Sequence, residues 1–180
     1  MVNSQTSIQT YIIVAVFSLL VLAPGQVIAE EYKPYVGSKA FEQMKQLVGT
    51  WKGTMDMGKG QEKITASYKL TSGGSAIVET VFEDTPMEMV TVYHDDSNKT
   101  LQMTHYCMLG NQPKMALKSM ENNQLSFTLS PDADVDVAKE RYMHALAITF
   151  DSPTNMTQHW TEFKDGEMGK PAKIVYTRVK

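Results

Sequence analysis

The chain has 180 residues and a formal net charge of −3, from 17 basic and 20 acidic residues. No basic stripe runs along it, and we therefore expect no nucleic-acid partner. A single cysteine, Cys107, excludes an internal disulfide, so burial of apolar side chains has to stabilise the fold.

The first residues have the pattern of a secretory signal peptide. Residues 11–22 form an apolar run that is interrupted only by Ser18 and is followed by Pro24-Gly25. The run is too short to span a bilayer as a mature helix. Val27-Ile28-Ala29 places small or branched residues before a cleavage point. We predict cleavage after Ala29, a secreted or periplasmic location, and no stable transmembrane segment after cleavage. Because residues 1–10 contain no Lys or Arg, an uncleaved anchor or a misassigned start stays an alternative.

A short helix is predicted after a polar lead-in of residues 30–37. Ser38 is a typical N-cap residue, and Gly49 is a typical C-terminal stop. The apolar residues between them fall on one helical face: Phe41, Met44, Leu47 and Val48.

From Thr50 onward apolar and polar residues alternate, which is the period of a half-buried β-strand. Turn sequences such as Gly73-Gly74 and Asp165-Gly166 separate the alternating runs. We predict ten strands, at residues 51–57, 64–71, 76–83, 88–94, 101–107, 115–120, 124–129, 143–150, 156–163 and 173–179. The absence of alternating strands and helices excludes a Rossmann-type fold. The predicted class is all-β: a single antiparallel up-and-down barrel of about 8–10 strands, because closure removes exposed edges.

Three segments resemble those of a known group of barrels. Residues 47–53, LVGTWKG, resemble the G-x-W start of calycins and the G-x-W-x-G start of nitrobindin-like barrels. Arg178 resembles the basic residue that packs over that tryptophan. Residues 104–115, THYCMLGNQPKM, are similar to a motif of an uncharacterised family of secreted bacterial proteins with calycin-like barrels. The resemblance implies a calycin-like domain over residues 38–180, of the lipocalin and fatty-acid-binding kind, and it implies no activity.

Trp51 and Arg178 have a structural role that can be predicted from physical chemistry alone. One end of a barrel with an apolar interior has to be closed against water. A tryptophan ring closes it with a large buried area, and a guanidinium group can stack on the face of that ring.

Met103, His105 and Cys107 are candidate metal ligands, because two-residue steps place them on one side of a strand. Thioether, imidazole and thiolate form a soft donor set for Cu(I) or haem iron. The alternative interpretation makes Met103 a flexible core residue and Cys107 a small hydrophobe. Same-face neighbours lie about 7 Å apart at their β-carbons, which strains a shared metal.

Two further histidines lie on predicted strands, where each points either into the barrel or outward. His144 shares a face with Leu146 and Ile148, so it is predicted to line the interior or to lie satisfied in the core. His159 alternates with Trp160, and only one of the two can point inward. We expect that one to be Trp160, the more apolar of the pair.

The predicted function is the binding of a small apolar or amphipathic ligand inside a secreted or periplasmic barrel, because barrels of this size enclose cavities. One alternative is haem or copper binding through His105, Cys107 and Met103, and another is a structural envelope protein with a filled barrel. An enzyme that acts on a barrel-bound substrate stays a further alternative, which we favour less because His105 and Cys107 have no recognisable orienting acid or oxyanion donor. No oligomeric state is indicated. The predicted lining residues are Tyr93, Met103, His105, Cys107, Phe127 and His144.

Overall fold

The computed structural model describes residues 33–56 and 60–179. They form a closed antiparallel barrel of ten strands with one short helix at one end and a separate 3-10 turn, η2 (Ser72–Gly74), which confirms the predicted all-β class. The predicted signal peptide and its cleavage after Ala29 lie outside the described residues, as does Met57. No helix in the described part of the chain has the length and the apolar character needed to cross a membrane.

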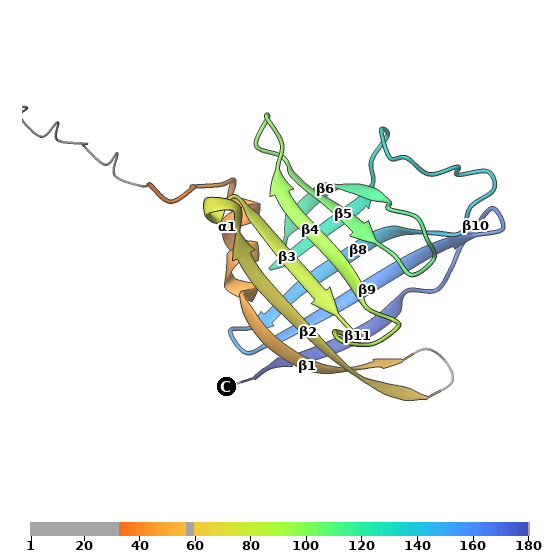
Figure 1. The fold of residues 1–180 in the computed structure, drawn as a ribbon, viewed down its shortest axis with the longest axis horizontal. Coiled ribbons are helices and arrows are strands. Elements are labelled where there is room, and N and C mark those ends of the chain that lie inside the picture. The colour runs from red at the N-terminus through yellow and green to blue at the C-terminus, as the bar shows by residue number, and fades with distance from the viewer. Residues whose placement is uncertain (1–32, 57–59, 180) are drawn as a thin grey trace, which may run out of the picture. The chain divides into compact units, whose positions relative to one another are not determined.

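The strands follow one another around the barrel, and each pairs with its neighbour in the chain from β1 to β9 (Figure 1). β11 inserts between β9 and β1, and the pairing of β8 with β9 closes the ring. The predicted bounds hold to within a few residues, and the two-residue β10 (Glu167–Met168) adds to the edge of β9. The barrel strands are β1 (Gly49–Asp56), β2 (Gln61–Thr71), β3 (Ala76–Val81), β4 (Met89–Asp95), β5 (Leu101–Tyr106), β6 (Lys114–Glu121), β7 (Gln124–Leu129), β8 (Tyr142–Ser152), β9 (Asn155–Lys164) and β11 (Ala172–Arg178).

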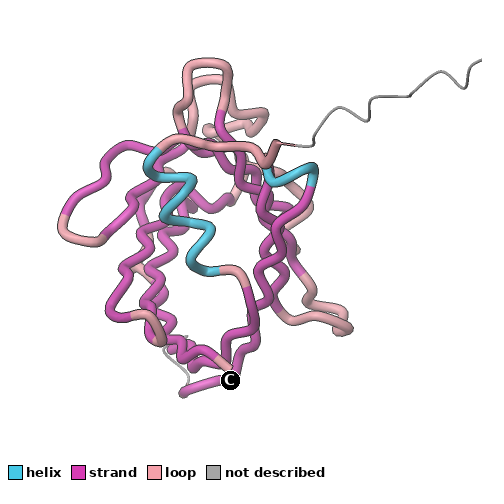
Figure 2. The backbone as a smooth tube through the Cα atoms, turned by 90° about the vertical axis from the view of Figure 1, so that its left-hand side faces the viewer, coloured by secondary structure: helices cyan, strands magenta, loops and turns pink. Residues whose placement is uncertain are grey.

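A short helical segment covers one end of the barrel (Figure 2). It consists of α1 (Lys39–Met44) and one 3-10 turn, η1 (Lys45–Leu47). Ser38 caps it, because its hydroxyl oxygen accepts a hydrogen bond of 3.1 Å from the backbone N–H of Phe41. The apolar face of this segment is buried against the barrel interior, where it excludes water from that end.

Contacts of Trp51 and Arg178 stabilise this closed end of the barrel. They face each other on β1 and β11, and the Arg178 guanidinium carbon lies 4.2 Å from the centroid of the Trp51 ring. Trp51 is 1 % exposed, and its Nε1 donates a hydrogen bond of 2.7 Å to the carbonyl of Leu47. Arg178 donates to the carbonyls of Val48 and Gln46, so it ties the end of the helical segment to the first and last strands.

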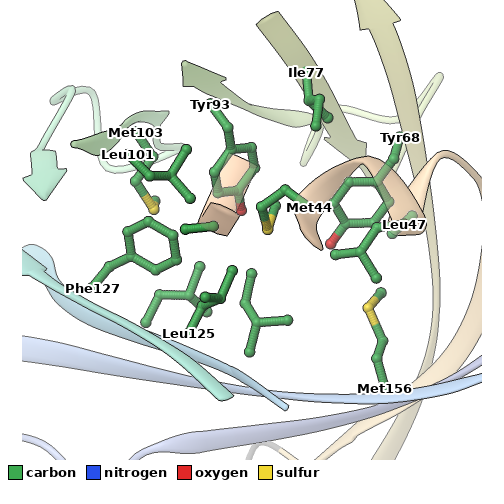
Figure 3. Close-up of a cluster of buried hydrophobic side chains, with 14 of the residues drawn as sticks. Met44, Leu47, Tyr68, Ile77, Tyr93, Leu101, Met103, Leu125, Phe127 and Met156 are labelled. Carbon is green, nitrogen blue, oxygen red and sulfur yellow. The ribbon is translucent and has the colours of Figure 1, made fainter. Parts of the chain in front are cut away.

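The half of the barrel next to the helical segment is filled by a packed core (Figure 3). Tyrosine, phenylalanine, methionine and branched side chains from most of the strands meet there with the helical face. The side chains labelled in the figure are Met44, Leu47, Tyr68, Ile77, Tyr93, Leu101, Met103, Leu125, Phe127 and Met156. This half of the barrel therefore has the filled interior that the sequence analysis raised as an alternative to a ligand cavity.

Candidate ligand-binding site

The opposite half of the barrel encloses a cavity of about 210 Å³. Its wall is built from the strand ends that lie away from the helical segment. These include the end of β3 at Val81, the start of β4 at Met89 and the start of β11 at Ala172. The packed core closes the inner end of the cavity, so the fold has one filled half and one hollow half.

Side-chain exposure shows which end of the cavity is closed and which is open. The inner side chains Glu79, Gln158 and Tyr176 are buried. Met87 and Met108 line the outer end and are 40 % and 60 % exposed. The cavity therefore has a polar, closed floor and an apolar mouth that a small molecule could enter from solvent.

Glu79 is the centre of the polar floor. It lies on β3 between the inward-facing Ile77 and Val81, so the strand period directs its side chain into the barrel. The hydroxyl of Tyr68 donates to its Oε1 at 2.7 Å, and the hydroxyl of Tyr93 donates to its Oε2 at 2.6 Å. Burial raises the pKa of Glu79, and these hydrogen bonds oppose that rise by stabilising the carboxylate.

Gln158 of β9 extends this network across the barrel to Trp160. Its side-chain nitrogen donates to Glu79 Oε1 at 3.0 Å and to the Tyr68 hydroxyl at 2.7 Å. Its side-chain oxygen accepts a hydrogen bond of 3.1 Å from Trp160 Nε1. The network therefore fixes the Trp160 ring on the cavity wall, the inward position that the sequence predicts for it.

His105 also lines the cavity, and it is held there as a neutral imidazole. Its Nδ1 lies 2.9 Å from Thr91 Oγ1, and its ring centroid lies 4.7 Å from that of Trp160. Burial lowers the pKa of His105 to about 4. A neutral imidazole offers one donor and one acceptor nitrogen and brings no positive charge to the cavity at neutral pH.

Because folding lowers the pKa of His105, titration of this residue makes the folded protein less stable as the pH falls. Its pKa falls from 6.5 to about 4 on folding, so the unfolded chain takes up the proton first as the pH decreases. The stabilising contribution of neutral His105 is complete above about pH 6.5 and is lost as the pH falls toward about 4. Over that window we expect the free energy of unfolding to fall more steeply than in His105→Gln, by up to about 1.4 kcal/mol per pH unit.

Chemical denaturation of the two proteins at a series of pH values measures this difference. The raised pKa of Glu79 acts with the opposite sign, because the folded state holds that proton more tightly than the unfolded state does. It is common to both proteins and cancels in the comparison. Parallel curves for the two proteins would contradict the assignment.

The structure separates the three predicted metal ligands. His105 and Cys107 both line the cavity, whereas Met103 is fully buried in the packed core. Burial raises the pKa of the Cys107 thiol, so at neutral pH it is a thiol and not the thiolate that binds metals. Within residues 33–56 and 60–179, no three His, Cys, Asp or Glu side chains are grouped to hold a metal ion. Binding of copper or haem through His105, Cys107 and Met103 stays a prediction.

The cavity wall does not include the other three predicted lining residues, Tyr93, Phe127 and His144. Tyr93 and Phe127 belong to the packed core, and Tyr93 reaches the floor only through its bond to Glu79. His144 contacts the rings of Tyr142 and Phe163, with ring centroids 6.0 Å apart in each case. A register irregularity of β8 between residues 143 and 145 places Met143 on the cavity wall in place of His144.

Sequence reasoning missed Glu79, Gln158 and Tyr176, the polar side chains of the floor. A signal for Glu79 is present, because a carboxylate between two apolar residues of the same strand face has to be buried with partners. Gln158 has a weaker signal, since it shares a strand face with the expected inward residue Trp160. Tyr176 has none, because tyrosine is common on both faces of a strand.

Comparison with known proteins does not add a relative. No family model matches the chain, and a search of curated proteins returned no match. The closed ten-stranded barrel is compatible with the calycin-like architecture that the sequence resembles. The function of the cavity is therefore inferred from its own geometry and chemistry.

Proposed function

We propose that this protein is a secreted or periplasmic binding protein that holds a small amphipathic molecule in the barrel cavity. The cavity itself carries the proposal: it has a polar floor, an apolar wall and an apolar mouth. Ligand sites in proteins are typically concave and apolar, with a few polar groups that orient the ligand. The signal-peptide pattern of residues 1–29 supports the location.

The volume of the cavity limits the size of the ligand. An engineered cavity of about 150 Å³ in another protein binds benzene, whereas pockets for drug-sized ligands measure about 300–1,000 Å³. At about 210 Å³, this cavity matches a substituted benzene ring or a short alkyl chain. A haem group is much larger and would require the barrel to open.

Methionines make the wall adaptable to ligand shape. Because the methionine side chain is unbranched and polarizable, it can follow the outline of more than one apolar molecule. We propose binding as the role of the cavity, since burial raises the pKa of the Cys107 thiol and thus disfavours the thiolate that would act as a nucleophile. The methionines on the wall, among the described residues, are Met55, Met87, Met89, Met108 and Met143.

Titration calorimetry with primary alcohols of increasing chain length tests the proposal. Each methylene group that enters the cavity contributes about 0.8 kcal/mol, which is about fourfold in affinity. We expect the affinity to rise by about this factor per methylene until the chain fills the cavity, and then to level off. Heats of dilution alone for every alcohol, and for aromatic amphiphiles of similar size such as benzylamine, would contradict the proposal.

Two variants in which leucine replaces an alanine test whether the alcohols bind in the cavity. Ala172→Leu narrows the cavity, so we expect weaker binding and a plateau at a shorter alcohol. Ala147→Leu is the matched control, because Ala147 lies on β8 between the inward-facing Leu146 and Ile148 and thus points outward. An equal loss of affinity in both variants would show that the alcohols bind elsewhere.

A further inference from the structure

The charges around the cavity are distributed unevenly. The floor holds the carboxyl group of Glu79, and within the described residues the basic side chain on the wall is Arg141. Arg141 lies at the exposed side and is ion-paired with Glu162, with Nη2 2.9 Å from Oε2. His105 is neutral, as described above. Among the residues that the structure describes, the inner end of the cavity therefore has an acidic group and no cation opposite it.

The floor also has unused hydrogen-bonding capacity. A carboxylate offers about four acceptor positions, and donors occupy three of those of Glu79: Tyr68, Tyr93 and Gln158. Tyr176, which is 0 % exposed and lines the cavity, has no hydrogen-bond partner for its hydroxyl group within residues 33–56 and 60–179. A buried polar group without a partner costs free energy, so a ligand that supplies one gains that contribution on binding.

We propose that the ligand is a small amphipathic amine whose ammonium group lies against Glu79 and the Tyr176 hydroxyl. Its apolar body extends along the Trp160 ring toward the mouth. This inference rests on the proposed function and names the chemical class of the ligand.

Charge favours an amine over an acid of the same shape. A carboxylate ligand would place a second negative charge beside Glu79, and two carboxylates in one site resist joint ionisation. An ammonium group supplies three donors and the missing positive charge. Glu79 is already removed from water in the folded protein and held by three hydrogen bonds, so it needs no reorganisation on binding.

Hydrogen bonding and the aromatic wall favour an amine over an alcohol. An alcohol donates one neutral hydrogen bond, whereas an ammonium group makes charge-assisted bonds that are about twice as strong. Trp160 and Tyr176 both line the cavity, and aromatic faces attract cations. Burial, followed by the charge of Glu79, raises the pKa of Tyr176, so its hydroxyl stays protonated and available.

Titration calorimetry with benzylamine, benzyl alcohol and benzoate at pH 7 tests the inference, because the three share one ring and differ in the head group. We expect benzylamine to bind at least tenfold more tightly than benzyl alcohol, and benzoate to bind most weakly. Equal or tighter binding of benzyl alcohol or benzoate would overturn the inference and leave the proposed function standing. If none of the three binds, and the alcohol series fails as well, the proposed function is contradicted.

Two variants test whether the floor of the cavity causes the preference for benzylamine over benzyl alcohol. Glu79→Gln keeps the shape and removes the charge, so benzylamine should lose its advantage while benzyl alcohol still binds. Tyr176→Phe removes a hydroxyl without a partner, so we expect an unchanged or higher melting temperature with severalfold weaker benzylamine binding. Tyr142→Phe is the matched control, since Tyr142 is buried outside the cavity. Unchanged benzylamine affinity in both floor variants would overturn the inference.

Discussion

Glu79→Ala lowers the free energy of unfolding by about 3–5 kcal/mol, the range for breaking a buried polar network. Three donors lose their acceptor: the hydroxyl groups of Tyr68 and Tyr93 and the amide of Gln158. Each buried donor without a partner costs about 1–3 kcal/mol, and the removal of a desolvated carboxyl group offsets part of the sum. Chemical denaturation followed by circular dichroism measures the change.

Matched substitutions separate this network from a general effect of removing an acid. Glu79→Gln keeps one acceptor oxygen and should cost less than Glu79→Ala, although its amide group meets a tyrosine hydroxyl as a second donor. Glu62→Ala removes an exposed carboxylate at the edge of the same cavity and should change stability by no more than about 0.5 kcal/mol. Equal effects of Glu79→Ala and Glu62→Ala would refute the role given to the network.

Trp51→Ala is the second substitution with a large expected effect, a loss of about 3–5 kcal/mol in the free energy of unfolding. The substitution removes the ring that closes the barrel, its hydrogen bond to Leu47 and the surface on which Arg178 stacks. Neighbouring strands hold β1 on both sides, so the site cannot collapse to fill the space. The same denaturation experiment measures the loss.

The other tryptophan provides the comparison. Trp160 is only partly buried and already borders a cavity, so Trp160→Ala enlarges an existing space and should cost less than Trp51→Ala. It should also weaken ligand binding, which Trp51→Phe should leave unchanged. A larger stability loss for Trp160→Ala than for Trp51→Ala would contradict the assignment of the closed and open ends.

The strands were predictable because alternation of apolar and polar residues reports directly which face of a strand is buried. The depth of a residue along the barrel axis is not encoded in this pattern. Tyr93, Met103 and His105 all face inward as expected, yet the first two lie in the packed core and only His105 reaches the cavity wall. Depth depends on which end the helical segment fills, and that follows from tertiary packing.

Irregularities of the strands also could not be predicted from the sequence. The register irregularity near His144 reverses which side chains of β8 face inward, and no glycine or proline marks it. Glu79, by contrast, could have been found, because a single acidic residue on an apolar strand face requires buried partners. Of its partners, Tyr68 lies directly opposite on the preceding strand, whereas Gln158 comes from a strand distant in sequence, so only the closed barrel identifies Gln158.

A crystal structure of the protein with 4-bromobenzylamine tests most directly whether the cavity is a binding site. The anomalous signal of bromine locates one end of the ligand without reference to its fit. We expect the bromine among the methionines of the mouth, with the amine nitrogen within hydrogen-bond distance of Glu79. Bromine density confined to the outer surface, with the cavity unchanged, would contradict the central claim that this barrel holds a small molecule.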